Sequence, residues 1–528
     1  MTPTRAAPGS PGEAPALSAS SRSPPALPRL FGSAVLAAVL ALAGCRTAAP
    51  PAAPDHYAPL VLVSLDGFRY DYRGRTPTPA LDRLAAEGVS AGRLVPVFPT
   101  LTFPNHYSLV TGLHPEHHGI VGNSMVDRAL GSFSLGDTAA VRDARWWGGE
   151  PLWVTAERQG TTAGAMFWPG SEAAIGGVRP TFWKPYDDDL AYEARVDTVL
   201  AWMSLPPARR PGFVTLYFSA VDSQGHRFGP DAPETTAAIA RVDSAVGRLL
   251  GGLDARGLGD RASVVVVSDH GMAALAPDRV VYLDDAAPRL AGRTERILWG
   301  ATTLVWPAPG QLDSLGAALS TLAHVSVYRR DAPAAAGGVP ERLHFRDHPR
   351  IAPLVLVADE GWTLTTRAEA RVPRGGTHGY DNAVASMAGI LIARGPAFRS
   401  GGAVVPTFNT VDVYEALCAA LGLSPAPNDG DAAAARSVLA PVPCTDSGAA
   451  PEESCPAGDA QPAARYGVSV RSDTTTGWSW FVPRNWPAGP WNAKRPVGIG
   501  VPIRSESPAD PIRRIAVDVT PPTVCETV

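Results

Sequence analysis

The sequence predicts an α/β protein with a mostly parallel sheet and helices on both faces. Two runs, LVLVS at 60–64 and VVVVS at 264–268, are apolar up to their final serine and do not alternate, as expected for strands buried on both sides. Helical patterns alternate with such β-branched runs from about residue 57 to 440, which is typical of a doubly wound fold. The helical segments that we expect are 79–88, 191–203, 235–253 and 411–422.

The composition of the 528 residues is that of a globular protein, with 45% hydrophobic and 18% charged residues. The formal net charge is −4, and the chain has no basic run with interleaved aromatic residues. Such a balance gives no long-range attraction to nucleic acid, so we expect no binding of nucleic-acid polymers. The sequence does not predict an oligomeric state.

Residues 1–45 have the pattern of a lipoprotein-type signal peptide. Scattered arginines precede an apolar run that is shorter than the roughly 20 residues of a membrane span. The run ends in Leu-Ala-Gly-Cys, which resembles a bacterial lipobox, so Cys45 is predicted to become the lipidated first residue. A plain signal peptide is the alternative. Residues 46–56 form a Pro/Ala linker, and we expect an exported, membrane-anchored lipoprotein that faces the periplasm or exterior of a bacterium.

Residues 441–528 are predicted to form a small appendage that is separate from a catalytic domain at 57–440. Pro, Ser, Gly and Trp become frequent there, and helical periodicity disappears. If Cys45 carries lipid, four cysteines remain in a chain that should reach an oxidising compartment, which predicts two disulfides. The pairing that closes the shortest loops joins Cys418 to Cys444 and Cys455 to Cys525.

Three apolar runs stop at residues that bind metals. The first ends at Asp66, the second at Asp222 and His226, and the third at Asp269 and His270. The carboxyl ends of parallel strands meet at one edge of a sheet, where loops converge into a site. An Asp after a strand often only caps a helix, but five such residues at three strand ends indicate a metal centre.

A sixth candidate ligand, His378, lies far downstream in the segment GGTHGYDN. The mixed set of histidines and carboxylates favours zinc over calcium or magnesium, while manganese and iron stay open.

Thr102 lies in the segment FPTLTFPNHYSLVTG, just ahead of a predicted helix. Such a threonine could simply be an N-cap. A hydroxyl at a helix N-terminus near a metal is also a reasonable phosphoryl acceptor, because the helix dipole and the metal both stabilise its negative form.

Several segments make the chain similar to the nucleotide pyrophosphatase/phosphodiesterase family of the alkaline phosphatase superfamily. The similarity covers about 57–440 and rests above all on TFPNHYSLVTG together with SDHGM. It implies an alkaline-phosphatase-like fold, with the chain as a bacterial lipoprotein member. It also implies two zinc ions, one held by Asp222, His226 and His378, and the other held by Asp66, Thr102, Asp269 and His270. Asn123 matches the asparagine that stabilises the transferring phosphoryl oxygen.

The resemblance implies hydrolysis of nucleotide phosphodiester or pyrophosphate bonds through a phosphothreonine at Thr102, with release of a nucleoside 5′-monophosphate. Two successive displacements predict overall retention at phosphorus. Nearby histidines, including His106, are expected to be structural. The aromatic residues that match positions around the base of a nucleotide substrate are Phe103, Trp168, Tyr186 and Tyr217.

Other functions stay open at this point. A phospholipid or choline-headgroup phosphodiesterase is the first alternative, because the same metal core serves both substrate classes in this family. A phosphate monoesterase is less favoured because no additional cationic groups can be assigned around Thr102, and a sulfatase because the nucleophile position holds threonine. A non-catalytic, ligand-binding surface lipoprotein is the alternative from a different class.

Overall fold

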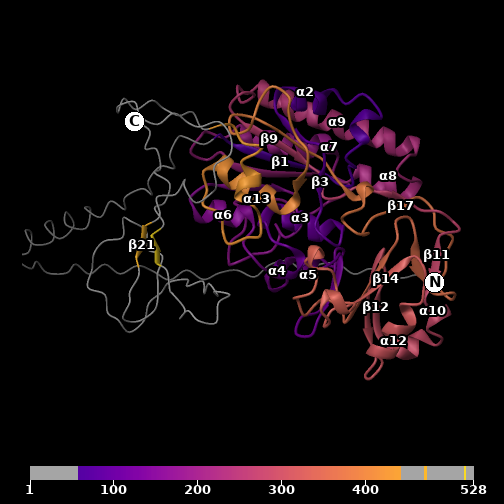
Figure 1. Ribbon diagram of the computed structural model, residues 1–528. Helices are drawn as coiled ribbons and strands as arrows, with labels where there is room; N and C mark the ends of the chain where they lie inside the picture. The colour runs from indigo at the N-terminus through magenta and orange to yellow at the C-terminus, as the bar shows by residue number, and fades with distance from the viewer. Residues whose placement is uncertain (1–57, 442–468, 472–515, 519–528) are drawn as a thin grey trace, which may run out of the picture. The chain divides into compact units, whose positions relative to one another are not determined.

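The computed structural model describes residues 58–441 and two short strands, β21 (Ser469–Arg471) and β22 (Ala516–Asp518) (Figure 1). The chain divides into two units, Met1–Val442 and Pro443–Val528, and β21 pairs with β22 inside the second. The predicted signal peptide with Cys45, the linker and the predicted Cys455–Cys525 bond lie outside the described residues. Among the described helices, none has both the length and the apolar character needed to cross a membrane.

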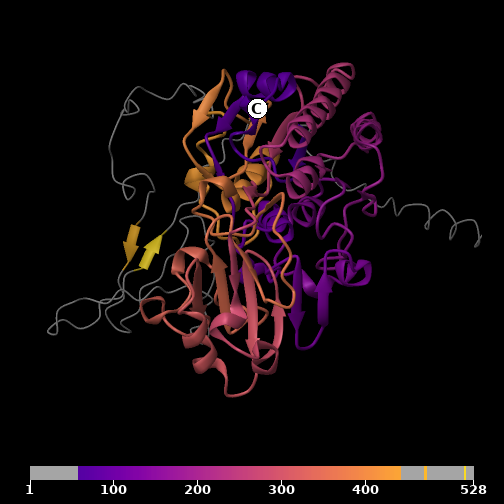
Figure 2. The same cartoon turned by 90° about the vertical axis from the view of Figure 1, so that its right-hand side faces the viewer.

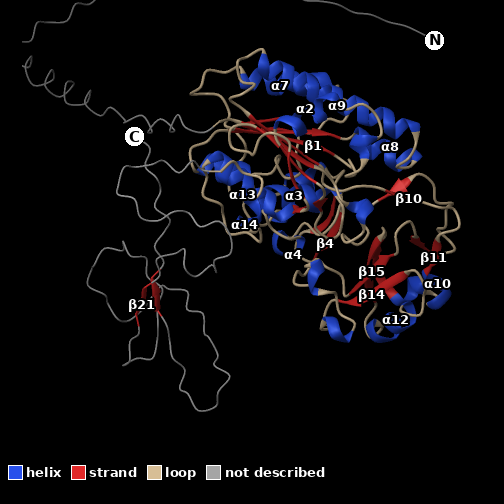
Figure 3. Ribbon diagram, turned by 45° about the horizontal axis from the view of Figure 1, so that its top comes forward, coloured by secondary structure: helices blue, strands red, loops and turns tan. Residues whose placement is uncertain are grey.

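The first unit contains a central sheet of eight strands (Figure 3). Its middle strands β9, β1, β8, β6 and β7 are parallel, and β18 alone runs antiparallel to its neighbours. The predicted mostly parallel sheet is therefore confirmed. The strand order is β19 (Ala403–Val405), β2 (Val89–Ala91), β18 (Leu391–Arg394), β9 (Ser263–Val267), β1 (Leu60–Leu65), β8 (Phe213–Phe218), β6 (Ala163–Met166) and β7 (Phe182–Trp183).

Helices cover both faces of this sheet, as the apolar strand cores predict (Figure 1). Successive side chains of β1 point to opposite faces, so Leu60 and Leu62 belong to one hydrophobic cluster, and Val61 and Val63 to the other. Each buried aliphatic side chain contributes about 1.5–3 kcal/mol. The first face carries α3 (Thr102–Thr111), α6 (Leu152–Arg158) and α13 (Thr410–Leu421), and the second carries α2 (Pro79–Glu87), α7 (Tyr192–Met203) and α9 (Pro233–Asp254).

A second, smaller antiparallel sheet, which the sequence pattern did not predict, is built from residues between β9 and β18 (Figure 2). Its order is β12 (Thr294–Leu298), β13 (Thr302–Pro307), β15 (Leu354–Ala358) and β14 (Val325–Arg329). Side chains of β13 and β15 pack with α12 (Leu312–Leu319) in a hydrophobic cluster of their own.

Short pairs of strands lie around the two sheets. They are β10 (Ala273–Ala274) with β17 (Gly376–Thr377), β11 (Val280–Tyr282) with β16 (Thr363–Thr365), β3 (Leu94–Val95) with β20 (Phe408–Asn409), and the hairpin β4 (Ser124–Asp127) and β5 (Gly131–Ser134). Among residues 58–441, the remaining helices of four residues or more are α4 (Pro115–His118), α5 (Thr138–Arg142), α8 (Ala220–Phe228), α10 (Leu283–Ala286), α11 (Leu290–Arg293) and α14 (Ala432–Ala435).

Cys418 is a free thiol in the structure, and its predicted partner Cys444 lies outside the described residues. The side chain lies on the buried face of α13 with no exposed surface, and burial raises its pKa to about 12. A thiol that packs into a hydrophobic core in this way behaves as a small apolar side chain.

Candidate active site and metal centre

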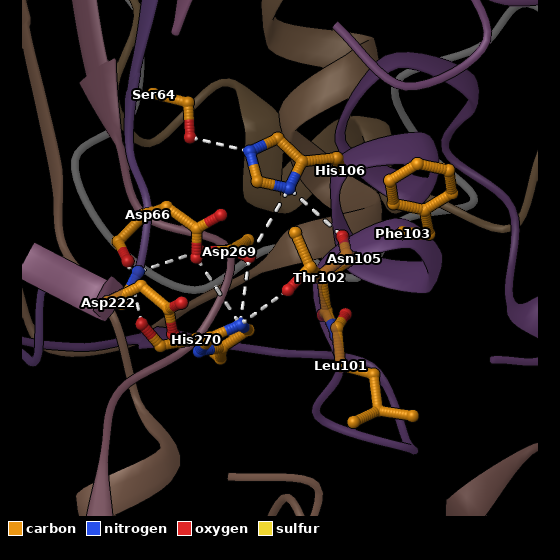
Figure 4. A network of polar contacts seen from close by, with 12 residues as sticks. Ser64, Asp66, Leu101, Thr102, Phe103, Asn105, His106, Asp222, Asp269 and His270 are labelled. Atoms are coloured by element: carbon orange, nitrogen blue, oxygen red, sulfur yellow. Dashed lines mark hydrogen bonds and ion pairs between the residues drawn. The ribbon is translucent and has the colours of Figure 1, made fainter. Parts of the chain in front are cut away.

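Three parallel strands deliver the acidic side chains to one edge of the central sheet. β1 pairs in register with β8 and β9, so their carboxyl ends are level with one another. Asp66 follows β1, Asp222 lies in the first turn of α8 after β8, and Asp269 follows β9. Figure 4 shows the three carboxylates side by side. This is the convergence that the sequence predicts.

A glycine allows the first two of these segments to approach closely. Gly67 has a φ of +67°, and a Cβ atom on it would lie 2.8 Å from the Cα of Asp222. The backbone N–H of Asp222 donates to the carbonyl of Asp66 over 3.1 Å. Only a residue without a side chain fits between the two aspartates.

Asp222, His226 and His378 form one group of potential metal ligands. Asp222 and His226 are four residues apart on α8, and the Oδ1 to Nε2 distance is 3.4 Å. His378 follows β17, and its Nε2 lies 3.1 Å from Nε2 of His226 and 3.6 Å from Oδ1 of Asp222. One ligand atom from each of the three lies within 4.8 Å of the others.

Asp66, Asp269 and His270 gather beside that group. Nε2 of His270 lies 3.0 Å from Oδ2 of Asp269 and 3.5 Å from Oδ1 of Asp66. Ligand atoms of Asp66, Asp222 and His270 also fall within 4.8 Å of one another, so Asp222 borders both groups. The structure therefore brings all six predicted carboxylate and histidine ligands together.

The three histidines are held so that the same nitrogen of each ring points into the site. Nδ1 of His226 bonds the carbonyl of Gly376 at 3.0 Å, and Nδ1 of His270 bonds that of Gly271 at 2.9 Å. Nδ1 of His378 bonds the carbonyl of Thr100 at 2.8 Å. A carbonyl accepts only from an N–H, so each neutral ring keeps a lone pair on Nε2, which is the form that binds a metal.

The carboxylates carry unsatisfied oxygens in a buried place. No described residue donates a hydrogen bond to Oδ1 of Asp66, Oδ1 of Asp222 or Oδ2 of Asp269. Burial raises the pKa of Asp66, with the charge of Asp269 adding to it, and burial also raises the pKa of Asp222. Burial would raise the pKa of Asp269 as well, but the charges of His270 and His106 hold it well below its usual range.

Buried carboxylate oxygens that accept no hydrogen bond are costly unless a cation compensates them. Together with the three aligned Nε2 atoms, these oxygens form a set of ligands that fits divalent metal ions. Imidazole and carboxylate ligands in one cluster suit zinc.

Thr102 is the first residue of α3, and its hydroxyl faces the cluster. Oγ1 lies 3.3 Å from Nε2 of His270 (Figure 4). The side chain makes no capping bond to the helix, and Leu101 occupies the N-cap position. The simple N-cap explanation for this threonine is therefore wrong. The first N–H groups of α3 favour negative charge at this point.

Asn123 lies beside the same helix terminus. Its Oδ1 accepts a 2.9 Å hydrogen bond from the backbone N–H of Phe103. With the oxygen held in this way, the Asn123 side-chain NH2 group is the free donor of the amide. The structure thus places a preorganised N–H donor next to Thr102.

His106 forms a supporting network that sequence reasoning expected only in general terms. Nδ1 lies 2.9 Å from the carbonyl of Thr102 and 3.2 Å from Oδ2 of Asp269, and Nε2 lies 2.8 Å from the hydroxyl of Ser64. The ring has no exposed surface. A side chain on α3 therefore lies between the Thr102 backbone and a carboxylate on the β9 loop.

The four predicted substrate aromatics occupy different environments. Trp168 is 4% exposed, and its indole N–H donates to the carbonyl of His106, so it packs behind the site. The Tyr217 hydroxyl donates to Oδ2 of Asp66 over 2.6 Å and so positions this carboxylate. Phe103 is half-buried, and Tyr186 is 51% exposed. These two offer more open ring surface than the others.

A family model for type I phosphodiesterase/nucleotide pyrophosphatase matches residues 60–381, which include every residue of this site. The chain belongs to this family. Bovine (Bos taurus) ectonucleotide pyrophosphatase/phosphodiesterase family member 3 is 37% identical over 403 residues, covering 73% of this chain and 45% of the relative. Venom phosphodiesterase of the cobra Naja atra is 36% identical over 413 residues, covering 73% and 47%. The chain thus spans about half the length of these curated relatives.

A solved structure of a shorter family member matches over its whole length. Murine ectonucleotide pyrophosphatase/phosphodiesterase 5, in an inactive threonine-to-alanine variant with AMP, superposes with a TM-score of 0.68 at 34% identity. The match covers 72% of this chain and 100% of the murine chain. The human counterpart gives the same score and identity. The alkaline-phosphatase-like fold expected from the sequence is thereby confirmed.

Proposed function

We propose that this protein hydrolyses nucleotide phosphodiester and pyrophosphate bonds and releases a nucleoside 5′-monophosphate. The observation that carries the proposal is the Thr102 hydroxyl, which opens α3 and faces the buried cluster, 3.3 Å from Nε2 of His270. The family assignment and the AMP complex of the murine relative support this substrate class.

The proposal includes two zinc ions. Asp222, His226 and His378 would hold one of them, and Asp66, Thr102, Asp269 and His270 would hold the other. Bound in this way, the ions would stabilise the charge on the attacking and leaving oxygens.

The chain's own residues position the reacting groups. The backbone of α3 aims the Thr102 oxygen at the phosphorus, and the N-terminal N–H groups of the helix favour the anionic form of the hydroxyl. The Asn123 amide donates to a phosphoryl oxygen as charge develops there. Phe103 and Tyr186 offer ring surface for the nucleoside.

The reaction proceeds in two displacements. In the first, a bond forms between Thr102 Oγ1 and phosphorus while the bond from phosphorus to the leaving oxygen breaks, and the hydroxyl proton passes to solvent. In the second, a water oxygen bonds to phosphorus and the water loses one proton, while the bond from phosphorus to Thr102 Oγ1 breaks and that oxygen takes up a proton. Two inversions give overall retention of configuration, which a chiral phosphorothioate diester would report.

We also propose that the protein acts outside the cytoplasm. The support is the segment before the catalytic unit, in which an apolar run ends in Leu-Ala-Gly-Cys45. A lipid on Cys45 would anchor the protein to a bacterial membrane, with the 46–56 linker between anchor and enzyme.

A variant pair and a substrate panel test the function. Purified wild-type protein, Thr102→Ala and Thr102→Ser are compared on ATP, a dinucleotide polyphosphate, bis-nitrophenyl phosphate, nitrophenyl phosphate and lysophosphatidylcholine. We expect hydrolysis of nucleotides and of the nitrophenyl diester, with at least a thousandfold loss in Thr102→Ala and partial activity in Thr102→Ser. Turnover of lysophosphatidylcholine alone would favour the headgroup alternative, and undiminished turnover by Thr102→Ala would refute the nucleophile.

A further inference from the structure

A cavity outside the catalytic cluster lies between the β4–β5 hairpin and the small antiparallel sheet. Its volume is about 660 Å³, within the range of roughly 300–1,000 Å³ that is typical of small-molecule sites. Figure 2 shows the purple hairpin beside the strands of the small sheet. None of the described residues of the metal cluster contributes to the walls of this cavity.

Three arginines line the cavity, one from each of its walls. Arg128 follows β4, Arg296 lies on β12, and Arg330 follows β14. Within residues 58–441, no carboxylate forms an ion pair with any of the three. Arg330 uses Nη1 for the carbonyls of His348 and Ile351, which fixes its guanidinium and leaves Nε and Nη2 free to donate.

The acidic residues of the cavity do not cancel this charge. Asp127 accepts from Nε of Arg350 at 2.9 Å, and this bond lowers its pKa, so its charge is already compensated. Glu295 is the other carboxylate in the wall. The three arginines against one uncompensated carboxylate leave an excess of positive charge around the cavity, which attracts an anion.

An aromatic ring stands beside one of the arginines. Arg296 and Trp306 are cross-strand partners on β12 and β13, so their side chains leave the sheet on the same face, and both line the cavity. Guanidinium groups bind phosphate through paired hydrogen bonds, and an indole offers a flat surface on which a planar ring stacks. The cavity combines both kinds of contact.

We propose that this cavity is a second ligand site, which binds a small phosphate-bearing molecule with a planar ring, as in a nucleoside monophosphate. The arginines take the phosphate, and Trp306 takes the ring. The site uses none of the groups assigned to turnover, and its ligand is bound without reaction. It goes beyond the proposed hydrolysis and does not require it.

Equilibrium dialysis with AMP tests the site on the whole purified protein. We expect the double variant Arg128→Glu/Arg296→Glu to bind one AMP fewer per chain than the wild type, because its affinity at the cavity falls at least tenfold. The double variant should hydrolyse bis-nitrophenyl phosphate at the wild-type rate. Arg261→Glu is the matched control, since it reverses an exposed arginine that does not line the cavity, and it should bind as many AMP molecules as the wild type.

Two further variants test the aromatic ring and a single arginine separately. Trp306→Leu should weaken AMP at the cavity while inorganic phosphate binds as in the wild type, and equal loss of both would remove the stacking role. If the charge reversals prevent folding, Arg128→Ala on the exposed turn should still weaken AMP binding at the cavity several-fold. A wild type and a double variant that bind the same number of AMP molecules would overturn the proposal. Stoichiometry is measured without turnover, so failure of the proposed hydrolysis would be seen separately.

Discussion

The Nε2 atoms of His226 and His378 face each other at 3.1 Å, although 152 positions separate the two residues. Both rings give their Nδ1–H to a backbone carbonyl, so two lone pairs point at each other when the rings are neutral. Burial, with the charges of His270 and His226, holds the pKa of His378 well below its usual range, which favours the neutral ring. Lone pairs in this arrangement repel unless a cation lies between them. Oδ1 of Asp222 lies 3.6 Å from Nε2 of His378 and is a third atom that a cation at this point would bind.

Metal removal should therefore abolish activity and lower stability together. Bound metal ions would offset the repulsion among the three carboxylates, so chelation is expected to stop hydrolysis of bis-nitrophenyl phosphate and lower the unfolding midpoint by several degrees. A metal present at a hundred times its dissociation constant stabilises a fold by about 2.7 kcal/mol. Zinc should restore both properties. A chelated protein with unchanged midpoint and rate, and no metal by elemental analysis, would contradict the metal centre.

Tyr217→Phe should weaken metal binding. The Tyr217 hydroxyl donates to Oδ2 of Asp66, and Phe removes this donor while keeping the ring. Loss of a hydrogen bond to a metal-binding carboxylate typically costs about 10–100-fold in affinity or activity. Competition with a chromogenic chelator measures the change. Tyr414→Phe is the control, because its hydroxyl bonds Thr155 in the core, and it should lose stability but keep metal affinity.

Gly67→Ala should disrupt the site through the backbone. The added methyl would lie 2.8 Å from the Cα of Asp222, so the β1 and α8 ends must separate. Gly160→Ala is the matched control, because its φ of +83° carries a similar conformational cost, but a Cβ there meets no described atom within 4 Å. We expect both variants to lose about 1 kcal/mol of unfolding free energy from the positive φ. Only Gly67→Ala should lose further stability and most of its hydrolytic activity, as urea titration and a diester assay will measure.

The sequence predicts the parts of the site that depend on strand ends. Asp66, Asp222 and Asp269 converge because parallel strands share a direction, and an apolar run shows where each one stops. It does not predict what holds His378 in place, because the carbonyl of Thr100 is brought there by tertiary folding.

The roles of Trp168 and Tyr217 were missed for the same reason. An aromatic residue in the sequence carries no sign of whether its ring packs behind a histidine or its hydroxyl reaches a carboxylate. The small antiparallel sheet was not predicted, partly because its outer strands β12 and β14 are partly exposed and their apolar pattern is weak. Its inner strands β13 and β15 are mostly buried, but an apolar run does not show to which sheet it belongs.

The stability of the first unit should fall as the pH decreases from about 6.5 to 4, partly through His348. Burial and the neighbouring charge of Arg350 lower the pKa of His348 to about 4, and its Nδ1 accepts from the backbone N–H of Arg350. Below pH 6.5 His348 is protonated in the unfolded chain but stays neutral in the folded chain. The unfolding free energy therefore decreases until the pH reaches the pKa of His348 in the folded chain. Because the side chain is partly exposed, we expect a contribution on the order of 1 kcal/mol.

His348→Asn isolates this contribution, because the Asn carbonyl can accept the same backbone N–H but does not titrate. Lowering the pH from 7 to 4.5 should therefore reduce the unfolding free energy of the wild type more than that of the variant. Urea unfolding at pH 7.0, 5.5 and 4.5 measures this shift. His117→Asn is the control, because the His117 ring is exposed and bonded to Asp429. Parallel pH profiles for wild type and His348→Asn would show that His348 is not held neutral by the fold.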